Sequence, residues 1–113
     1  MEWRLKRGEI WTLAGGPGFA GKPRPVLILQ SDEFAALESV TFCGFTSDQT
    51  YDVAIRPRIA PDESNHLNSV SDVMIDKITT APVSRLGNLI GVLSREDVAN
   101  VDQALLTFLG LLD

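Results

Sequence analysis

The segment that most constrains the fold is a glycine- and proline-rich stretch that runs directly into an apolar strand. It reads Gly15-Gly-Pro-Gly-Phe-Ala-Gly-Lys-Pro-Arg-Pro25, and Val26-Leu-Ile-Leu29 follows it. The glycines let the backbone come close to a ligand. Pro23 and Pro25 fix their own φ angles, and Pro25 also holds Arg24 in an extended conformation. We therefore expect a flexible loop that leads to an arginine held at the mouth of a buried strand.

Length and composition predict one small domain over residues 1–113. A chain of 113 residues can bury a core, and its 44% hydrophobic and 22% charged residues are ordinary for a globular protein. No apolar run approaches the roughly 20 residues of a membrane span, and no export signal opens the chain. The single cysteine, Cys43, excludes an internal disulfide and fits a reducing compartment. We expect a cytoplasmic protein without membrane contact.

The distribution of charge narrows the choice of ligand. The net charge is −5, which argues against long duplex DNA. However, residues 1–25 hold five cations and two acids, whereas residues 26–113 hold five cations and thirteen acids. A local charge of +3 beside the glycine-rich loop is enough to hold a few phosphates.

Periodicity predicts several short strands and one final helix. We expect strands over residues 7–13, 26–30, 40–46, 51–56, 73–75, 78–80 and 88–93. A helical turn is expected from Ser31 or Asp32 to Leu37, a tight or 3₁₀ turn at 82–85, and a long irregular segment at 57–69. Ser94 caps the predicted C-terminal helix, with Asp97 at the third position of a capping box. An apolar face on that helix is formed by Val98, Val101, Leu105, Phe108, Leu109 and Leu112. Together these elements predict a mainly β (α+β) fold, a small β-barrel with a helix packed on it.

At this point the chain resembles the MazF/PemK family of toxin endoribonucleases from type II toxin–antitoxin systems. The resemblance lies in Arg7-Gly-Glu-Ile-Trp11, Gly21-Lys-Pro-Arg-Pro-Val-Leu-Ile-Leu29, Phe45-Thr-Ser47 and Asp76, then Ile78-Thr79 and Ser84-Arg-Leu-Gly87. It runs from Arg7 to Leu111. Among the departures, Lys77 stands where the family frequently has a glutamine, and the loop over residues 57–68 is atypical.

This resemblance implies a fold, an activity and partners. The fold would be an SH3-like barrel of the CcdB/PemK type, usually a homodimer. The activity would be metal-independent, sequence-selective cleavage of single-stranded RNA with no cofactor, which inhibits translation and growth. The partner would be an antitoxin whose acidic, disordered tail covers the groove around Arg24.

Arg24 and Thr46 are the predicted catalytic residues. Attack of a ribose 2′-hydroxyl on the adjacent phosphorus builds charge on the phosphoryl oxygens, and a guanidinium can bind two of these oxygens in parallel. The family uses the arginine and the threonine of the motifs that contain Arg24 and Thr46. On residue chemistry alone, Arg24 could instead pair with a surface carboxylate, and Thr46 could simply satisfy its own turn.

Three further residues are candidates for RNA binding. Lys22 offers a point charge for phosphate or simply solvates the loop. Phe19 offers a ring on which a base can stack, or it shields the core edge or meets a partner, and Ser47 offers a neighbouring hydroxyl. Structural interpretations fit other residues better: His66 as a solvated loop residue, Cys43 as a small core residue, and Asp76 with Arg85 as a structural pair. No cluster of ligands suggests a metal.

Two other functions fit the same fold. One is a growth inhibitor similar to the gyrase-poisoning CcdB proteins, which rely on a tryptophan close to the C-terminus. This chain has no aromatic residue after Phe108. The other is an inactive SH3-like interaction module.

Overall fold

The structure, a computed structural model, describes residues 5–15 and 22–112. In this part the chain forms short strands, three 3₁₀ turns and one helix. The strands are β1 (Glu9–Leu13), β2 (Arg24–Ile28), β3 (Ser39–Thr46), β4 (Arg58–Ile59), β5 (Ser71–Val73), β6 (Thr79–Pro82) and β7 (Leu86–Val92). The 3₁₀ turns are η2 (Asp32–Phe34), η3 (Ile75–Lys77) and η4 (Val83–Arg85), and the helix is α1 (Arg95–Phe108).

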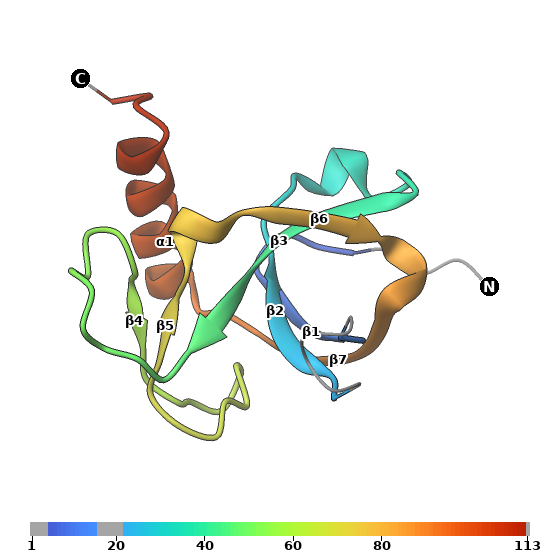
Figure 1. The fold of residues 1–113 in the computed structure, drawn as a ribbon, viewed down its shortest axis with the longest axis horizontal. Coiled ribbons are helices and arrows are strands. Elements are labelled where there is room, and N and C mark those ends of the chain that lie inside the picture. The colour runs from blue at the N-terminus through green and yellow to red at the C-terminus, as the bar shows by residue number, and fades with distance from the viewer. Residues whose placement is uncertain (1–4, 16–21, 113) are drawn as a thin grey trace.

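The strands form one curled antiparallel sheet. Its order is β4-β5-β3-β2-β1-β7, and β6 also pairs with β3. Figure 1 shows the strands curling around one another, with α1 beside β4 and β5. β3 is the strand that connects the parts, because it pairs with β2 along one edge and with β5 and β6 along the other. The mainly β fold with a C-terminal helix that the sequence predicts is confirmed.

Both faces of the central strands are buried, as the apolar run after Pro25 predicts. Leu27 packs in a cluster under the helix that includes Ile10, Cys43 and Val101. Its neighbours Val26 and Ile28 point to the other face and pack with residues of β3 and β6. A strand covered on both sides needs a continuous apolar run rather than an alternating one.

The C-terminal helix begins where its capping pattern predicts. The Ser94 hydroxyl accepts a hydrogen bond from the Asp97 amide at 3.1 Å, which satisfies one of the amides that the first turn leaves without a partner. Val101 and Ala104 are buried against the sheet, and Val98 and Leu105 pack at the edge of the same cluster. The helix ends at Phe108, so Leu112 of the predicted apolar face lies outside it, and Phe108, Leu109 and Leu112 are exposed.

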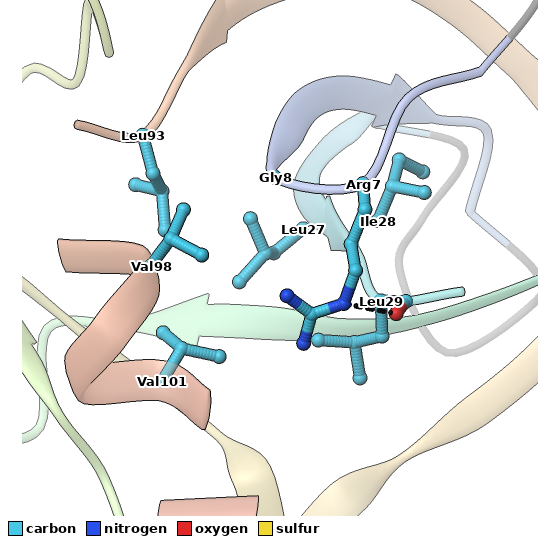
Figure 2. A pocket seen from close by; sticks show the side chains of 8 residues that line it. All are labelled: Arg7, Gly8, Leu27, Ile28, Leu29, Leu93, Val98 and Val101. Carbon is cyan, nitrogen blue, oxygen red and sulfur yellow. Dashed lines mark hydrogen bonds between the residues drawn. The ribbon is translucent and has the colours of Figure 1, made fainter. Parts of the chain in front are cut away.

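Arg7 fastens the helix to the barrel. Its Nε donates to the carbonyl oxygen of Leu29 at 2.7 Å, and its Nη2 lies 2.7 Å from a carboxylate oxygen of Asp102 on α1. Figure 2 shows its guanidinium between the end of β2 and the helix, beside Leu27 and Val101. The side chains around it leave no space for a water molecule. This corner is therefore packed structure rather than a binding site.

The predicted strand over residues 51–56 is wrong. The alternating apolar residues Tyr51, Val53 and Ile55 imitate a strand, but all three are exposed. The segment turns because the Asp52 carboxylate accepts a hydrogen bond from the Ala54 amide, and the Asp52 carbonyl accepts from the amides of residues 55 and 56. Local hydrogen bonds of an aspartate can replace those of a sheet in this way.

The remaining predicted elements are confirmed with shifted ends. The turn after Ser31 is the short 3₁₀ turn η2, and the turn at 82–85 contains η4. The strand expected at 73–75 lies earlier, at Ser71–Val73, and Ile75 belongs to η3 instead. The long segment after Pro57 is irregular apart from β4.

Candidate functional site

A groove of about 740 Å³ crosses the sheet at the C-terminal end of β3. Residues from β1, β2, β3, β5 and β6 and from the turns η3 and η4 line it. Arg24, Thr46 and Ser47 are among these residues. Three of the residues predicted from the sequence therefore lie around one cavity.

Strand register explains why Arg24 and Thr46 line the same groove although they lie 22 positions apart in the sequence. β2 and β3 are antiparallel, and Val26 lies opposite Gly44. When this register is continued by two residues along each strand, Arg24 comes opposite Thr46. Directly opposite residues of antiparallel strands project to the same face of the sheet. Arg24 is exposed at the start of β2, and Thr46 is half-buried.

The groove is positively charged although the protein is negative. Arg24, Lys77 and Arg85 line it, and no carboxylate is among the described residues that do so. The other lining residues combine apolar side chains with hydroxyl groups. The apolar ones are Leu13, Pro25, Val26, Phe42, Phe45, Met74 and Ala81, and the hydroxyl groups belong to Thr46, Ser47, Ser69, Ser71, Thr79 and Thr80. A groove lined by apolar side chains and three cations suits a ligand that has both flat apolar surfaces and negative charges.

The Thr46 hydroxyl is partly engaged by the turn that follows it. Its Oγ1 accepts a hydrogen bond from the Asp48 amide at 3.1 Å. Thr46 therefore satisfies its own turn, which is the alternative to a catalytic role that its residue type allows. The two roles are compatible, because a hydroxyl that accepts one hydrogen bond still has its own proton to donate.

Two of the other residues predicted to bind RNA, Lys22 and Phe19, are not among the described residues that line the groove. Lys22 is exposed. Phe19 lies outside the described residues. His66 is an exposed loop residue, as its predicted solvated position requires. Its backbone φ angle is 55°. Cys43 is fully buried, and loss of solvation raises the pKa of its thiol to about 12, so it remains a neutral core side chain.

The predicted pair of Asp76 and Arg85 is wrong. Asp76 instead accepts two hydrogen bonds from Arg56, at 2.9 and 3.0 Å, which hold the pKa of its carboxyl below the usual value. The guanidinium of Arg85 donates to the carbonyl oxygen of Ala14, at the end of β1. Arg85 also lines the groove, a role that the sequence reasoning missed.

Lys77 and Met74 are also groove residues that the sequence reasoning did not single out as functional. Both come from the segment that follows β5, where the Met74 amide donates to the Gly44 carbonyl at 3.0 Å and brings the segment against β3. The one signal in the sequence was the departure at Lys77, a cation in place of the glutamine frequent in the resembled family.

No group of three or more His, Cys, Asp or Glu side chains in residues 5–15 and 22–112 could hold a metal ion. No helix in that part of the chain is long and apolar enough to cross a membrane.

Fold and groove together define a small curled-sheet protein with a cationic groove. Comparison with known proteins identifies the family to which the chain belongs. Residues 6–109 match the family described as PemK-like, MazF-like toxin of type II toxin–antitoxin system. The chain therefore belongs to this family of toxins, and the resemblance predicted from its motifs is confirmed.

Individual relatives agree with this assignment. A protein of Mycolicibacterium smegmatis named probable endoribonuclease MazF is 46% identical over 107 residues, which cover 95% of this chain and 98% of that protein. The solved structure of the Mycobacterium tuberculosis toxin MazF-mt6 has a TM-score of 0.75 at 27% identity and covers 93% of this chain and 98% of its own. A mycobacterial endoribonuclease solved with its cognate antitoxin has a TM-score of 0.77, with 96% of this chain and 98% of its own covered. At 22% identity, it supports the fold alone.

Proposed function

We propose that this toxin is a sequence-selective endoribonuclease that cleaves single-stranded RNA without a metal ion. The observation that carries the proposal is that Arg24 and Thr46 line one groove with two further cations and no described carboxylate. A single strand of nucleotides has both features that this groove suits, since its phosphates are anionic and its bases are flat and apolar. The 46% identical relative, named a probable endoribonuclease, supports the same activity.

In the proposed reaction the ribose 2′-oxygen bonds to the adjacent phosphorus while the bond from phosphorus to the 5′-oxygen breaks. The 2′-hydroxyl loses its proton and the leaving oxygen gains one, so the products are a 2′,3′-cyclic phosphate and a free 5′-hydroxyl. Negative charge accumulates on the phosphoryl oxygens during attack. Arg24 binds these oxygens through parallel hydrogen bonds. Thr46 donates its hydroxyl proton to a phosphoryl oxygen or to the leaving oxygen.

The rest of the groove holds the strand on either side of the cleaved bond. Lys77 and Arg85 offer charges for neighbouring phosphates, and Phe45 and Met74 offer apolar surface for a base. Lys22, Ser47 and Phe19 remain predicted RNA contacts. Sequence selectivity then depends on the shape of the groove wall.

We further propose that the protein acts in the cytoplasm, forms a homodimer, and is inhibited by a cognate antitoxin. The charge of the groove supports the last point, because an acidic, extended segment would be attracted by the cations that receive RNA. The mycobacterial endoribonuclease of the same fold has been solved with its own antitoxin.

The test is cleavage of a long RNA by the purified protein in the presence of EDTA, with the product ends analysed. We expect cutting at defined sequences and 2′,3′-cyclic phosphate ends. Arg24→Ala should lower the rate by at least about 100-fold, the scale seen when one stabilising donor is removed, without loss of folding. Arg95→Ala is the matched control, because Arg95 is an exposed arginine outside the groove.

Intact RNA at high protein excess, across varied sequences, would contradict the proposed activity. Inhibition of gyrase without RNA loss would favour the CcdB-like alternative instead. Normal cutting by the Arg24→Ala variant would leave the activity standing but show that Arg24 is not a catalytic residue.

A further inference from the structure

We propose that Arg58 and Asp72 are positioning residues that fix Thr46 and the turn after it in the groove. The inference rests on the proposed function, because it concerns the same site. Neither residue is expected to touch RNA. Their role is to set the direction of the Thr46 hydroxyl.

The sheet places the three residues in one row. Thr46 of β3 lies opposite Asp72 of β5, and Asp72 in turn lies opposite Arg58 of β4. Continued to the other side of β3, the same row leads to the position of Arg24. The ion pair therefore stands directly behind the residue that the proposed mechanism uses.

Burial makes this pair unusual. Asp72 is fully buried, and it accepts hydrogen bonds from Nε and Nη2 of Arg58 at 2.9 and 3.1 Å. Asp72 loses its hydration, whereas the Arg58 side chain keeps 36% of its surface exposed, so this ion pair adds little stability compared with apolar side chains of the same size. What two parallel hydrogen bonds do provide is a fixed orientation of both groups. The two parallel hydrogen bonds indicate that the buried Asp72 carboxylate serves to fix the orientation of Arg58.

Arg58 extends this orientation to the turn after Thr46. Its Nη2 also donates to the carbonyl oxygen of Gln49 at 3.2 Å. The preceding residue, Asp48, donates its amide to Thr46 Oγ1. A continuous series of contacts thus runs from the buried carboxylate through Arg58 and the turn to the hydroxyl in the groove.

The experiment compares Arg58→Lys with Arg7→Lys. A lysine at 58 keeps a charge for Asp72 but loses the planar fork that serves Asp72 and Gln49 together. Arg7→Lys is the control. It removes a guanidinium that also makes two polar contacts, to the Leu29 carbonyl and to Asp102 on α1, and Arg7 does not line the groove. Both variants are assayed for kcat and KM well below their melting temperatures, and hydrogen exchange of the Asp48 amide is followed.

We expect Arg58→Lys to lower kcat by about 10- to 100-fold, as a small misplacement of a reacting group does. KM should change little, and the Asp48 amide should exchange faster. Arg7→Lys should change neither kcat nor that amide. An unchanged kcat in Arg58→Lys would overturn the proposal.

A third variant separates positioning from stability. The double replacement Arg58→Met with Asp72→Val removes the pair without leaving a buried charge, so the protein should regain the stability that a single replacement loses. We expect its kcat to stay low. Recovery of kcat together with stability would show a merely structural role and overturn the proposal.

Failure of the proposed function is recognised separately. If the unaltered protein cuts no RNA, that function has failed, and the exchange rate of the Asp48 amide decides the positioning role by itself. Faster exchange in Arg58→Lys but not in Arg7→Lys would support it, and equal rates in all three proteins would overturn it.

Discussion

Arg85 and Lys77, two cationic side chains of the groove, differ in their hydrogen bonds and ion pairs. Arg85 already donates to the Ala14 carbonyl, which places its guanidinium at the end of β1. For Lys77, no hydrogen bond or ion pair of the side chain is found within the described residues, and its neighbour Asp76 is bound by Arg56 on both oxygens. Asp76 is thus already matched by an arginine, so the charge of Lys77 is available to a phosphate.

Lys77→Gln should therefore weaken RNA binding in a salt-dependent way. Each phosphate contact that is lost should reduce the slope of log affinity against log salt by about 0.7 for a single strand. The measurement is fluorescence anisotropy with an RNA that carries 2′-O-methyl groups and cannot be cut. Lys6→Gln serves as the control, because Lys6 is exposed outside the groove. Identical slopes for both variants would show that Lys77 contacts no phosphate.

Among the elements, the irregular segment after β4 is ordered by its own side chains. Asn65 is fully buried, accepts hydrogen bonds from the amides of Asp62 and Leu67, and donates to the carbonyl of Ala60. The Ser64 carbonyl then accepts the Val92 amide at 2.9 Å, which fastens the loop to β7. Gly91 permits this contact, because a Cβ there would collide with the carbonyl oxygens of residues 64 and 65.

Gly91→Ala should accordingly destabilise the protein by about 1 to 3 kcal/mol, the usual result of forcing an extra methyl group into packed structure. Its Cβ would lie 2.7 Å from the Asn65 oxygen, and backbone cannot move aside easily. Gly44→Ala is a useful comparison, since its Cβ would meet only the flexible end of Met74. Chemical denaturation measures both, and an equal loss in the two variants would argue against the proposed clash.

Sequence reasoning found the elements whose signals are local. The run from Val26 and the cap at Ser94 depend on neighbouring residues, and both are confirmed. The strand predicted over 51–56 failed because alternating apolar residues resemble a strand even where the bonds of Asp52 make a turn. The partners of Arg56 and Arg58 depend on strand register across the sheet, which no short stretch of sequence contains. For the same reason only the family resemblance brought Arg24 and Thr46 together in advance.

At the scale of the whole molecule, the fold stabilises three carboxylates in the ionised form, whereas burial raises the pKa of Asp97. Hydrogen bonds lower the pKa of Asp48, Asp62 and Asp76, from Thr50, Asn65 and Arg56 respectively. Each of these groups binds a proton less readily in the folded state than in the unfolded chain. Unfolding therefore takes up protons, and their contribution to stability is present above a pH of about 4 and lost below it.

Stability should consequently fall as the pH drops from about 4 to 2, and Asp76→Asn should weaken this dependence. The asparagine cannot release a proton, so the share of the acid sensitivity that belongs to the Arg56 pair disappears. Melting temperatures of both proteins across this pH range provide the measurement. Parallel curves for the two proteins would show that the pair does not contribute to acid sensitivity.

The burial of Cys43 has a practical consequence for following this protein at work. Because the chain has one cysteine, and that thiol is buried and neutral, thiol reagents leave the folded protein unmodified. A second cysteine placed at an exposed site such as Val53 would then be the single position that takes a dye. Fluorescent reporters can therefore be attached at chosen exposed sites of the toxin without first removing Cys43.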